Sequence, residues 1–487
     1  MNEPPQKKLR AEQESKCSEN VPQIVIDSLY SESVGARLWN VACRALGKRS
    51  QSDPPTFYPE YTGNDGATYV YRHLSFWTSG FFPGSLYLLL ERRKNNGQSG
   101  TQHSYPNSLQ LHHLCQWWSI NLHQNASLKS THDLGFMIAP WATKAWELCK
   151  DEQAFSSLVL AAHSLASRFC PKVQSIRSWD TCKTKKYAFL DTSTDFLVII
   201  DNMINLDMLF WVAKHTGDQN LYDIAVSHAR TTQKQHVRPE KTTFHVVNFD
   251  PETGYPKQKF TNQGYSEDSC WARGQAWGIL GFAQTFHWTG DNSFLRTSQD
   301  LADFFIERLP ADDVPYWDLD APITRESPRD TSAAMIAACG MLLIYKALKA
   351  KGRDDEAMQY VKAAMRIARG TCEKFLNPPT LRFTVSPSGR AIQIYEEGLA
   401  SDYQEKSEPG LLTIDDGISA TGLLSTKKNG TVPKEPHTAE TILTGATINN
   451  YEFAPRRWAN HGLVYADYYF MLLGNMLLDL GLVEPDQ

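Results

Sequence analysis

The stretch FWVAKHTGDQNLYDIAVSHA, residues 210–229, contains an apolar helical segment that ends at a glycine and is followed by an aspartate that begins a second helix. Glycine just beyond a helix and aspartate at a helix start are favoured at these positions. The same pattern recurs in FAQTFHWTGDNSFLRTSQDLADFF (282–305) and, more loosely, in IYKALKAKGRDDEAMQYVKAAM (344–365). This repetition predicts pairs of antiparallel helices in an array.

Helical periodicity extends over most of the chain. Apolar residues recur at three- and four-residue spacing in segments 25–46, 195–215 and 332–350, whereas period-two alternation is rare. We expect about twelve helices, and six helical hairpins can close into a double-walled (α/α)6 barrel. Segment 194–213 is apolar nearly all round, as a helix of the inner wall should be. An open α-solenoid is the alternative all-α architecture.

Composition divides the chain into a tail and a large domain. Residues 1–22 are polar and are expected to form a disordered tail, whereas residues 23–487 are expected to form a single barrel domain. Residues 403–450 form a polar insertion that we expect to be partly mobile. Two further long segments, 238–268 and 308–332, mix Trp, His and Asp and are expected to gather at one mouth of the barrel.

Charge and cysteine usage limit the partners and the compartment. The 487 residues carry a formal charge of -5 and no long basic run, so the chain lacks the electrostatic footprint of a nucleic-acid-binding protein. No uninterrupted apolar run is long enough to predict a membrane span, and the first residues lack the apolar region of a secretory signal. The nine cysteines are scattered without a C-x-x-C pair, which favours reduced thiols and a cytoplasmic location.

Two carboxylates interrupt apolar sequence. Asp201 lies inside VIIDNMINL (198–206), where burial would raise its pKa and suit it to general acid catalysis. A buried aspartate that caps or bridges helices is the alternative interpretation. Asp133 lies in THDLGFM (131–137) immediately before an apolar segment, where an ordinary N-cap is the structural alternative.

The segment NQGYSEDSCWARGQAWGI (262–279) combines aromatic, amide and cationic side chains. Trp271 and Trp277, like Trp77 in FWTSGFFPG (76–84), could stack on sugar rings or could simply fill the core. Arg273 lies four residues before Trp277 and therefore shares its helix face. Together with Gln263 and a helix N-terminus, which we expect Ser266 or Ser269 to cap, this arrangement suits a carboxylated, hydroxyl-rich ligand such as an acidic sugar.

Several of these blocks resemble one family. The chain is similar to the unsaturated glucuronyl hydrolases of glycoside hydrolase family 88 over roughly residues 70 to 480, and the blocks stand in the same order as in that family. The resemblance implies an (α/α)6 barrel. The blocks are THDLGFM, IIDNMINL (199–206), QGYSEDSCWARGQAWGI (263–279), VPYWDLDAP (314–322) and RDTSAAMIA (329–337).

The resemblance also implies a reaction on oligosaccharides that end in a 4,5-unsaturated uronic acid. These enzymes hydrate the C4=C5 enol ether, and the resulting hemiketal collapses. The resemblance assigns the general acid/base to Asp201 and the second essential carboxylate to Asp133. It assigns substrate contacts to Trp77, His245, Gln263, Trp271, Arg273 and Trp277. The chain departs from the family at Asn262, where bacterial members often carry His, and in the length of the insertion at 403–450.

No cofactor or metal is expected for this chemistry, because the adjacent pairs His112–His113 and His132–Asp133 lack the spacing of zinc ligands. Three other functions remain open. An unsaturated rhamnogalacturonyl hydrolase would share the barrel and the reaction. A sugar epimerase would be expected to rely on a pair of histidines, and a non-catalytic carbohydrate-binding barrel would need the tryptophans but not both carboxylates.

Overall fold

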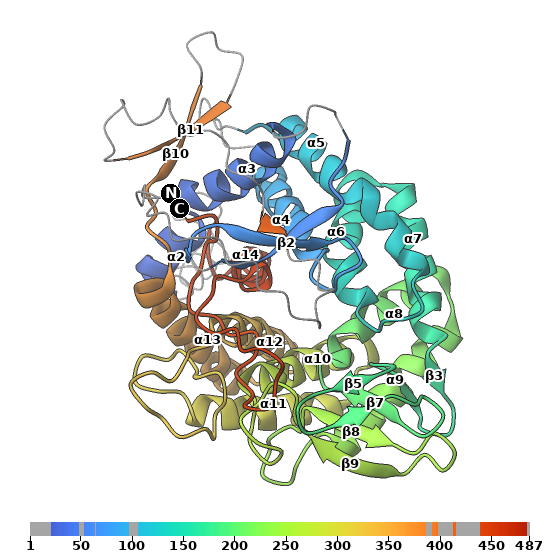
Figure 1. Cartoon of the computed structure of the whole chain (residues 1–487). Coiled ribbons are helices and arrows are strands. Elements are labelled where there is room, and N and C mark those ends of the chain that lie inside the picture. Colours follow the sequence, from blue (N-terminus) through green and yellow to red (C-terminus); the bar gives the residue numbers. More distant parts are fainter. Residues whose placement is uncertain are drawn as a thin grey trace, which may run out of the picture.

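The computed structural model describes residues 21–47, 53–63, 65–96, 106–385, 392–397, 413–414 and 439–484. The predicted disorder of the tail therefore concerns residues that lie almost entirely outside the described ranges. The described chain is mainly helical, and its helices form two concentric layers (Figure 1).

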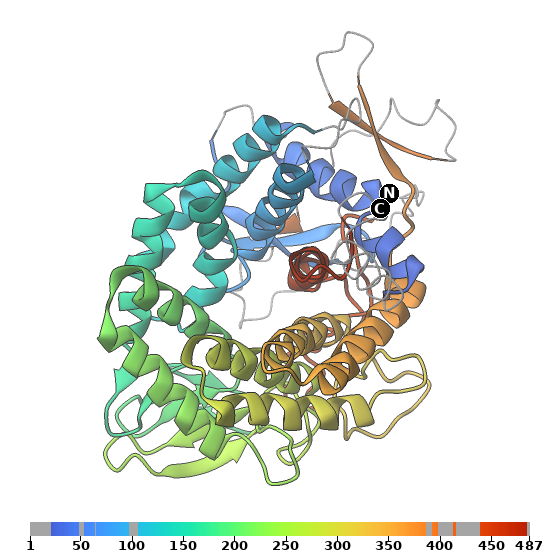
Figure 2. The ribbon, with the colours of Figure 1, turned by 180° about the vertical axis from the view of Figure 1, so that it is seen from behind.

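The inner layer is a closed ring. Within the described residues each of its six helices contacts the next one in chain order, and the last contacts the first (Figures 1 and 2). The architecture is therefore the predicted (α/α)6 barrel, and the ring closure excludes an open solenoid. The inner helices are α4 (Phe81–Asn96), α6 (Leu134–Cys149), α8 (Asn202–Thr216), α10 (Ala272–Thr289), α12 (Thr331–Lys349) and α14 (Val464–Asp479).

The outer layer follows from the hairpin connections. Each of five outer helices packs against the inner helix that precedes it in the chain. A short 3-10 helix, η1 (Ile120–Ser127), continues the first of them and packs against α6 and α7. The five are α5 (Ser108–Ser119), α7 (Glu152–Ala166), α9 (Gln219–Gln235), α11 (Asn292–Glu307) and α13 (Asp354–Phe375).

The sixth outer position is filled from the opposite end of the chain. Helix α2 (Gln23–Leu29) packs against α13 and α14, and α3 (Glu32–Gly47) packs against α4. Arg92 on α4 joins these parts: its buried guanidinium donates to the Leu29 and Met471 carbonyls at 2.7 Å each and to the side chain of Asn475. The barrel is thus closed by contacts between segments far apart in the sequence.

The predicted pattern, a glycine that ends one helix and an aspartate that begins the next, is confirmed in its two clearest copies. Gly217 and Gly290 end α8 and α10 with φ of 76° and 69°. Asp218 and Asp291 then accept backbone N–H groups at the starts of α9 and α11. In the looser third copy the glycine again has a positive φ, but α13 begins without a side-chain cap.

The inner helices are buried on all sides, as predicted for segment 194–213. Helix α8 is buried continuously from Asn202 to Leu206 and again from Met208 to Ala213. Of the described helices, α12 alone is long and apolar enough to cross a membrane, and 83% of its apolar window is buried inside the barrel. Its hydrophobicity is therefore explained by its place in the inner wall.

One prediction of secondary structure is wrong. Residues 196–199, expected to begin an inner helix, form strand β7 (Phe196–Ile199), and α8 begins only at Asn202. This strand pairs with β8 (Val246–Phe249), which pairs with β9 (Pro256–Phe260). The β-branched pair Val198–Ile199 favours an extended backbone, and tertiary pairing outweighs the helical periodicity of the segment. The sheet lies in front of the helical ring in Figure 1.

The long connections meet at this same side of the barrel, as predicted. Trp271 forms a bridge with Asp318, and the Asn449 amide donates to the Asn262 carbonyl at 3.1 Å, which joins three segments. A second sheet of β1 (Phe57–Thr62), β2 (Tyr69–His73) and β12 (Thr413–Ile414) also lies there (Figure 1). Smaller strand pairs are β3 (Phe169–Cys170) with β4 (Ser175–Ile176), and β5 (Cys182–Lys183) with β6 (Ala188–Phe189).

The predicted insertion at 403–450 is only partly described. Residues 439–450 pack against the barrel, where the backbone N–H groups of Ile442 and Leu443 donate to Asp467 of α14 at 2.9 Å each. The mobility predicted for the rest of the insertion concerns residues outside the described ranges. Just before it, the hairpin of β10 (Leu381–Val385) and β11 (Ile392–Glu396) packs on α3 and projects from the barrel (Figure 1).

Candidate active site

The candidate site is built at the N-terminal ends of the inner helices. Asp133 immediately precedes α6, and Asp201 immediately precedes α8. Trp271 and Arg273 stand at the start of α10, and Tyr465 stands in the first turn of α14. Because a helix N-terminus carries partial positive charge, several of them facing one space favour an anionic ligand.

Asp201 has the properties of a general acid. It occupies the N-cap position of α8, yet its side chain makes no capping hydrogen bond, and its Oδ1 atom is buried without a partner. Burial raises the pKa of Asp201 to about 7; the positive charge of Arg273 opposes this rise, and the negative charge of Asp133 adds to it. The capping interpretation is therefore wrong, and a carboxyl group that can hold a proton near neutral pH remains.

Asp133 is also not a capping residue. It precedes α6 without a side-chain capping bond, and its carboxylate is 19% exposed. The hydroxyl of Thr131 donates to its Oδ2 at 2.9 Å, and Nε2 of the buried His132 lies 3.3 Å from its Oδ1. The carboxylate is thus held from one side while it stays close enough to Asp201 to raise the pKa of that residue.

His245 reaches the site from the strand that pairs with β7. The backbone N–H of Asn262 donates to its Nδ1 at 3.1 Å, and burial lowers its pKa to about 3. The ring is therefore neutral, and its proton resides on Nε2, which is buried without a partner. The indoles of Trp271 and Trp179 flank the ring, with centroids 4.5 and 5.8 Å away.

Arg273 is buried beneath the site and is already paired. Its guanidinium donates to Oδ2 of Asp330 at 2.9 Å and to the carbonyls of Thr447 and Ile448. It also lies over the ring of Tyr465, 5.5 Å from the centroid. Because Asp330 compensates its charge, Arg273 acts first as a buried structural residue that holds together the segments around the site.

The predicted aromatic residues differ in exposure. Trp77 is half-buried, and its ring lies 5.5 Å from that of Phe136 and 5.1 Å from that of Tyr465. Trp277 has no exposed surface, so it presents no face for stacking in this arrangement. Its indole lies close enough to the Asp201 carboxyl to lower the pKa of that group, although Nε1 has no partner with hydrogen-bonding geometry.

Two further predictions concern the segment that enters α10. Gln263 is half-buried and follows Asn262, whose backbone binds His245. The predicted capping of α10 by Ser266 or Ser269 is wrong, because Trp271 occupies the N-cap position without a side-chain cap. The Ser269 hydroxyl donates instead to Asp318 at 2.7 Å, since the chain stays irregular up to the first helical residue.

Three residues of the site escaped sequence reasoning. Asp330 was detectable, because it stands two residues before Ser332 at the head of an apolar segment and does cap α12. Tyr465 and Trp179 gave no such signal. They lie in the aromatic sequence of α14 and in an irregular connection, and only tertiary packing brings them to the site.

Several buried polar atoms of the candidate site lack hydrogen-bond partners. Such atoms are normally satisfied by protein groups, ordered water or a ligand, so these groups are available to a substrate rich in oxygen. Three of the groups can donate a hydrogen bond, and the carboxyl can supply a proton. The unpartnered atoms are Oδ1 of Asp201, Nε2 of His245, Nε1 of Trp277 and the hydroxyl of Tyr465.

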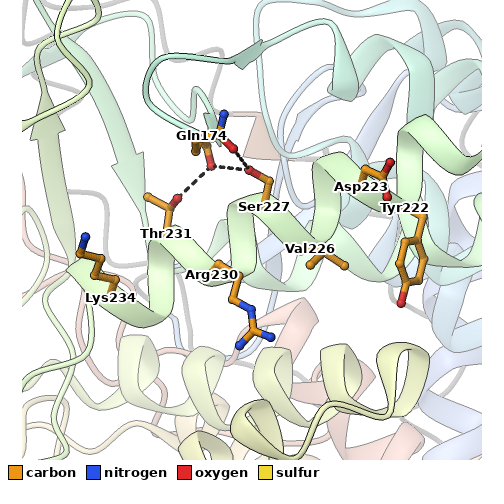
Figure 3. Close-up of a pocket in the computed structure, with 8 residues that line it drawn as sticks. All are labelled: Gln174, Tyr222, Asp223, Val226, Ser227, Arg230, Thr231 and Lys234. Carbon is orange, nitrogen blue, oxygen red and sulfur yellow. Dashed lines mark hydrogen bonds between the residues drawn. The ribbon is translucent and has the colours of Figure 1, made fainter.

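Two surface pockets lie away from these residues. One, of about 410 Å3, follows the outer face of α9, where Ser227 and Thr231 donate to Gln174 (Figure 3). The other, of about 640 Å3, is lined by Lys129, Arg168 and Arg177 among others. Neither is lined by a predicted site residue, so the chemistry is assigned to the ends of the inner helices.

Comparison with known proteins gives several similar sequences, although no family model matches the chain. The chain is 36% identical over 286 residues to an unsaturated glucuronyl hydrolase of Formosa agariphila. The aligned region covers 58% of this chain and 66%, just under two thirds, of that protein. It is 33% identical over 301 residues to an unsaturated chondroitin disaccharide hydrolase of Streptococcus pneumoniae, covering 62% and 71%. It is 33% identical over 306 residues to an unsaturated glucuronyl hydrolase of Bacillus sp. strain GL1, covering 62% and 75%.

Solved structures show the same fold. The crystal structure of an unsaturated glucuronyl hydrolase specific for heparin superposes with a TM-score of 0.69 at 24% identity, covering 96% of this chain and all of that one. An unsaturated glucuronyl hydrolase of Streptococcus agalactiae superposes with a TM-score of 0.64 at 25% identity, covering 91% and 90%. The likeness thus extends over nearly the whole barrel.

Proposed function

Because the chain belongs to the family of unsaturated glucuronyl hydrolases, which release unsaturated uronic acid from oligosaccharides, we propose that Asp201 and Asp133 are its catalytic pair. The observation that carries this proposal is the burial of Asp201 beside Asp133, which raises the pKa of Asp201 to about 7. A carboxyl group with such a pKa is protonated in a large fraction of molecules near neutral pH and can still act as a base after it has given up its proton.

The reaction follows from these two roles. Protonated Asp201 transfers its proton to C4 of the C4=C5 enol ether, and positive charge develops at C5 and the ring oxygen. The carboxylate of Asp133 stabilises that charge. Water then adds to C5 and returns a proton to Asp201, which restores the starting state. The hemiketal opens and releases the leaving sugar together with a keto acid. In ordinary glycosidases the distance between the two carboxylates determines whether the anomeric configuration is retained or inverted. That rule does not apply here, because one carboxyl serves as both acid and base.

The remaining predicted residues are proposed to bind the sugar. Nε2 of His245 is a donor without a protein partner, which suits a substrate oxygen. Trp77 keeps exposed surface at the same end of the barrel and suits stacking on a ring. Gln263 follows Asn262, whose backbone N–H binds His245, and the ring of Trp271 packs against the ring of His245. Arg273 and Trp277 contribute from beneath, through charge and through the indole next to Asp201.

We propose products of glycosaminoglycan lyases as the first substrates to test, since relatives are named for chondroitin disaccharides and for heparin. The assay follows the loss of ultraviolet absorbance of the conjugated enol ether with unsaturated chondroitin, hyaluronan, heparin and glucuronan disaccharides. A pectin-derived unsaturated rhamnogalacturonan disaccharide is the comparison. Turnover of the pectin product alone would transfer the proposal to an unsaturated rhamnogalacturonyl hydrolase.

An isotope experiment tests the chemistry itself. In heavy water, hydration by Asp201 places deuterium at C4 of the product in a single configuration. Attack of water at the anomeric carbon would instead release an intact unsaturated sugar, whose later opening in solution gives both configurations at C4. Detection of that sugar as the first product would overturn the proposed reaction.

A reducing, cytoplasmic location is proposed as well. The eight cysteines in the described part of the chain are all free. Disulfides persist mainly in oxidising compartments, so free thiols support a reducing one. Fractionation of cells that produce the natural protein, with activity assayed in each fraction, tests this proposal.

A further inference from the structure

We propose that Glu267 is a positioning residue for the sugar-binding side of the site. It joins the hairpin of β5 and β6 to the segment that enters α10, and through that hairpin it holds Trp179 against His245. The inference rests on the proposed function, which gives His245 a substrate contact, and it assigns a role to a residue outside the predicted site.

The hairpin of β5 and β6 packs on the sheet that leads to the site. Cys182, Tyr187 and Phe189 of the hairpin lie in one hydrophobic cluster with residues of β7, β8 and β9. Trp179, just before β5, packs against the same cluster and forms a bridge with β7. Its ring centroid lies 5.8 Å from that of His245. A shift of the hairpin would therefore move Trp179 relative to His245.

Glu267 binds the turn of this hairpin. Its Oε1 atom accepts hydrogen bonds from the Lys186 ammonium at 2.6 Å and from the Tyr187 hydroxyl at 2.9 Å. Burial alone would raise the pKa of Glu267, but hydrogen bonds, that from Lys186 above all, outweigh burial and hold the pKa below its ordinary value. The carboxylate is therefore ionised at neutral pH and holds both donors. The carbonyl of Glu267 accepts the Arg238 guanidinium at 3.0 Å, which fixes the backbone from which the carboxylate extends.

The same turn contacts a third segment, residues 449–458. The Lys185 backbone N–H donates to the Phe453 carbonyl at 2.9 Å. At the start of that segment the Asn449 amide donates to the Asn262 carbonyl, and the Asn262 backbone N–H donates to His245. The hairpin, the entry to α10 and residues 449–458 therefore hold one another around His245.

The contact is better suited to positioning than to overall stability. The side chains of Lys186 and Glu267 are 41% and 27% exposed, and ion pairs near the surface contribute little to stability. Each strand of the hairpin has only 2 residues, and a short two-stranded hairpin is not stable on its own. Loss of the Glu267 contacts should thus loosen the hairpin while the barrel stays folded.

The test compares two substitutions of Glu267 with a matched control. Glu267→Met keeps the length of the side chain and removes the acceptor for both donors. In Glu267→Gln the amide oxygen can still accept a hydrogen bond from the hairpin. Glu252→Met is the control, because Glu252 also pairs with a lysine, Lys172, at 2.6 Å, but in the exposed turn between β8 and β9.

We expect Glu267→Met to raise KM for the preferred disaccharide on the order of tenfold, which is the most that one misplaced aromatic contact contributes. The kcat should stay close to that of wild type, because a sugar contact made equally in the ground state and the transition state affects binding alone. Glu267→Gln should lie closer to wild type than Glu267→Met does. Glu252→Met should match wild type in both constants.

The environment of Trp179 gives a readout without substrate. The protein is labelled with fluorotryptophan and measured by fluorine NMR, and the Trp179→Phe variant identifies the Trp179 resonance. This resonance should shift or broaden in Glu267→Met and stay unchanged in Glu252→Met. Lys186→Met removes one donor on the hairpin side and should change KM and the resonance in the same direction, by less.

A KM for Glu267→Met equal to that of Glu252→Met would overturn the inference. A fall in kcat at constant KM would overturn it as well, because it would place Glu267 in the chemical step. If Glu267→Met does not fold, Lys186→Met decides in the same way. Inactivity of the wild type on every unsaturated oligosaccharide would refute the proposed function. The Trp179 resonance would then still decide whether Glu267 positions this side of the site, and an unchanged resonance would overturn the inference.

Discussion

Two carboxylates in one space govern the chemistry at the residue scale. Asp201 lies where burial raises its pKa to about 7, and Asp133 adds to that rise through its negative charge. A negative charge nearby makes it harder for a carboxyl group to ionise. The role of each carboxyl can therefore be tested through the other.

Replacement of Asp201 by asparagine removes the proton donor and keeps the shape of the side chain. We expect Asp201→Asn to lower kcat on the order of 10²–10⁴-fold, the contribution of a general acid/base, with KM close to that of wild type. Steady-state kinetics on the preferred disaccharide measure both constants. Asp207→Asn is the matched control, because Asp207 lies in the same helix and accepts the Trp288 indole N–H at 2.6 Å, away from the site. Activity of Asp201→Asn equal to that of the control would remove Asp201 from its role.

Replacement of Asp133 by asparagine should change the pH dependence in a defined direction. The proton on Asp201 is required for catalysis, so the rate falls as pH rises through its pKa. Because the charge of Asp133 raises that pKa, Asp133→Asn should lower it and move the alkaline limb of kcat/KM to lower pH, in addition to slowing the reaction. A profile of kcat/KM against pH decides the matter; a limb that stays in place or moves upward would show that the carboxyls are not coupled.

At the scale of elements, the ion pair of Arg273 and Asp330 joins α10 to α12 and to residues 447–448. Loss of one member of a buried pair leaves the other charge uncompensated. We expect Arg273→Met to lower the free energy of unfolding by about 3–5 kcal/mol in urea denaturation. The same substitution should move the alkaline limb to higher pH, because Arg273 lowers the pKa of Asp201.

The double variant Arg273→Met/Asp330→Asn is the control for this prediction. It removes both charges and should lose less stability than the single variant. If Arg273 served mainly to bind the uronate, the single variant would unfold like wild type and show only a raised KM, which would contradict the assigned structural role.

The helices and strands also show which parts of the fold could be predicted from the sequence. Gly217 with Asp218 and Gly290 with Asp291 were read correctly because helix ends depend on local backbone chemistry. Strand β7 was missed because its partner β8 lies some fifty residues away, beyond the reach of periodicity. Asp201 and Asp133 were found because they interrupt apolar sequence, whereas Asp330 was overlooked and Tyr465 lies in a helix whose aromatic residues look like ordinary core.

At the scale of the whole molecule, closure of the ring depends on a few contacts between distant segments. Arg92 joins α2, α4 and α14, and the hydroxyl of Tyr30 donates to the Gly474 carbonyl at 2.7 Å. The helix pairs could be counted from the sequence. That the last inner helix returns to the first could only be supposed, because nothing local specifies a contact across nearly four hundred residues.

We expect Arg92→Met to lower the free energy of unfolding by about 3 kcal/mol or more, because it removes three buried hydrogen bonds from a charged donor. Urea denaturation measures the loss. Arg366→Met is the control: its side chain is half exposed and pairs with Asp313 at 3.5 Å, so its loss should cost less than about 1 kcal/mol. Equal stabilities of the two variants would show that Arg92 does not secure the closure.

The way the ring closes has a consequence for biosynthesis. Helix α14 is the last of the six inner helices to leave the ribosome, and its neighbours α2 and α4 are among the first elements to do so. Throughout translation, the apolar inner faces of the earlier helices lack the surface that covers them in the finished barrel. We therefore expect the yield of soluble protein in cell-free translation to rise when chaperones that bind exposed apolar segments are added.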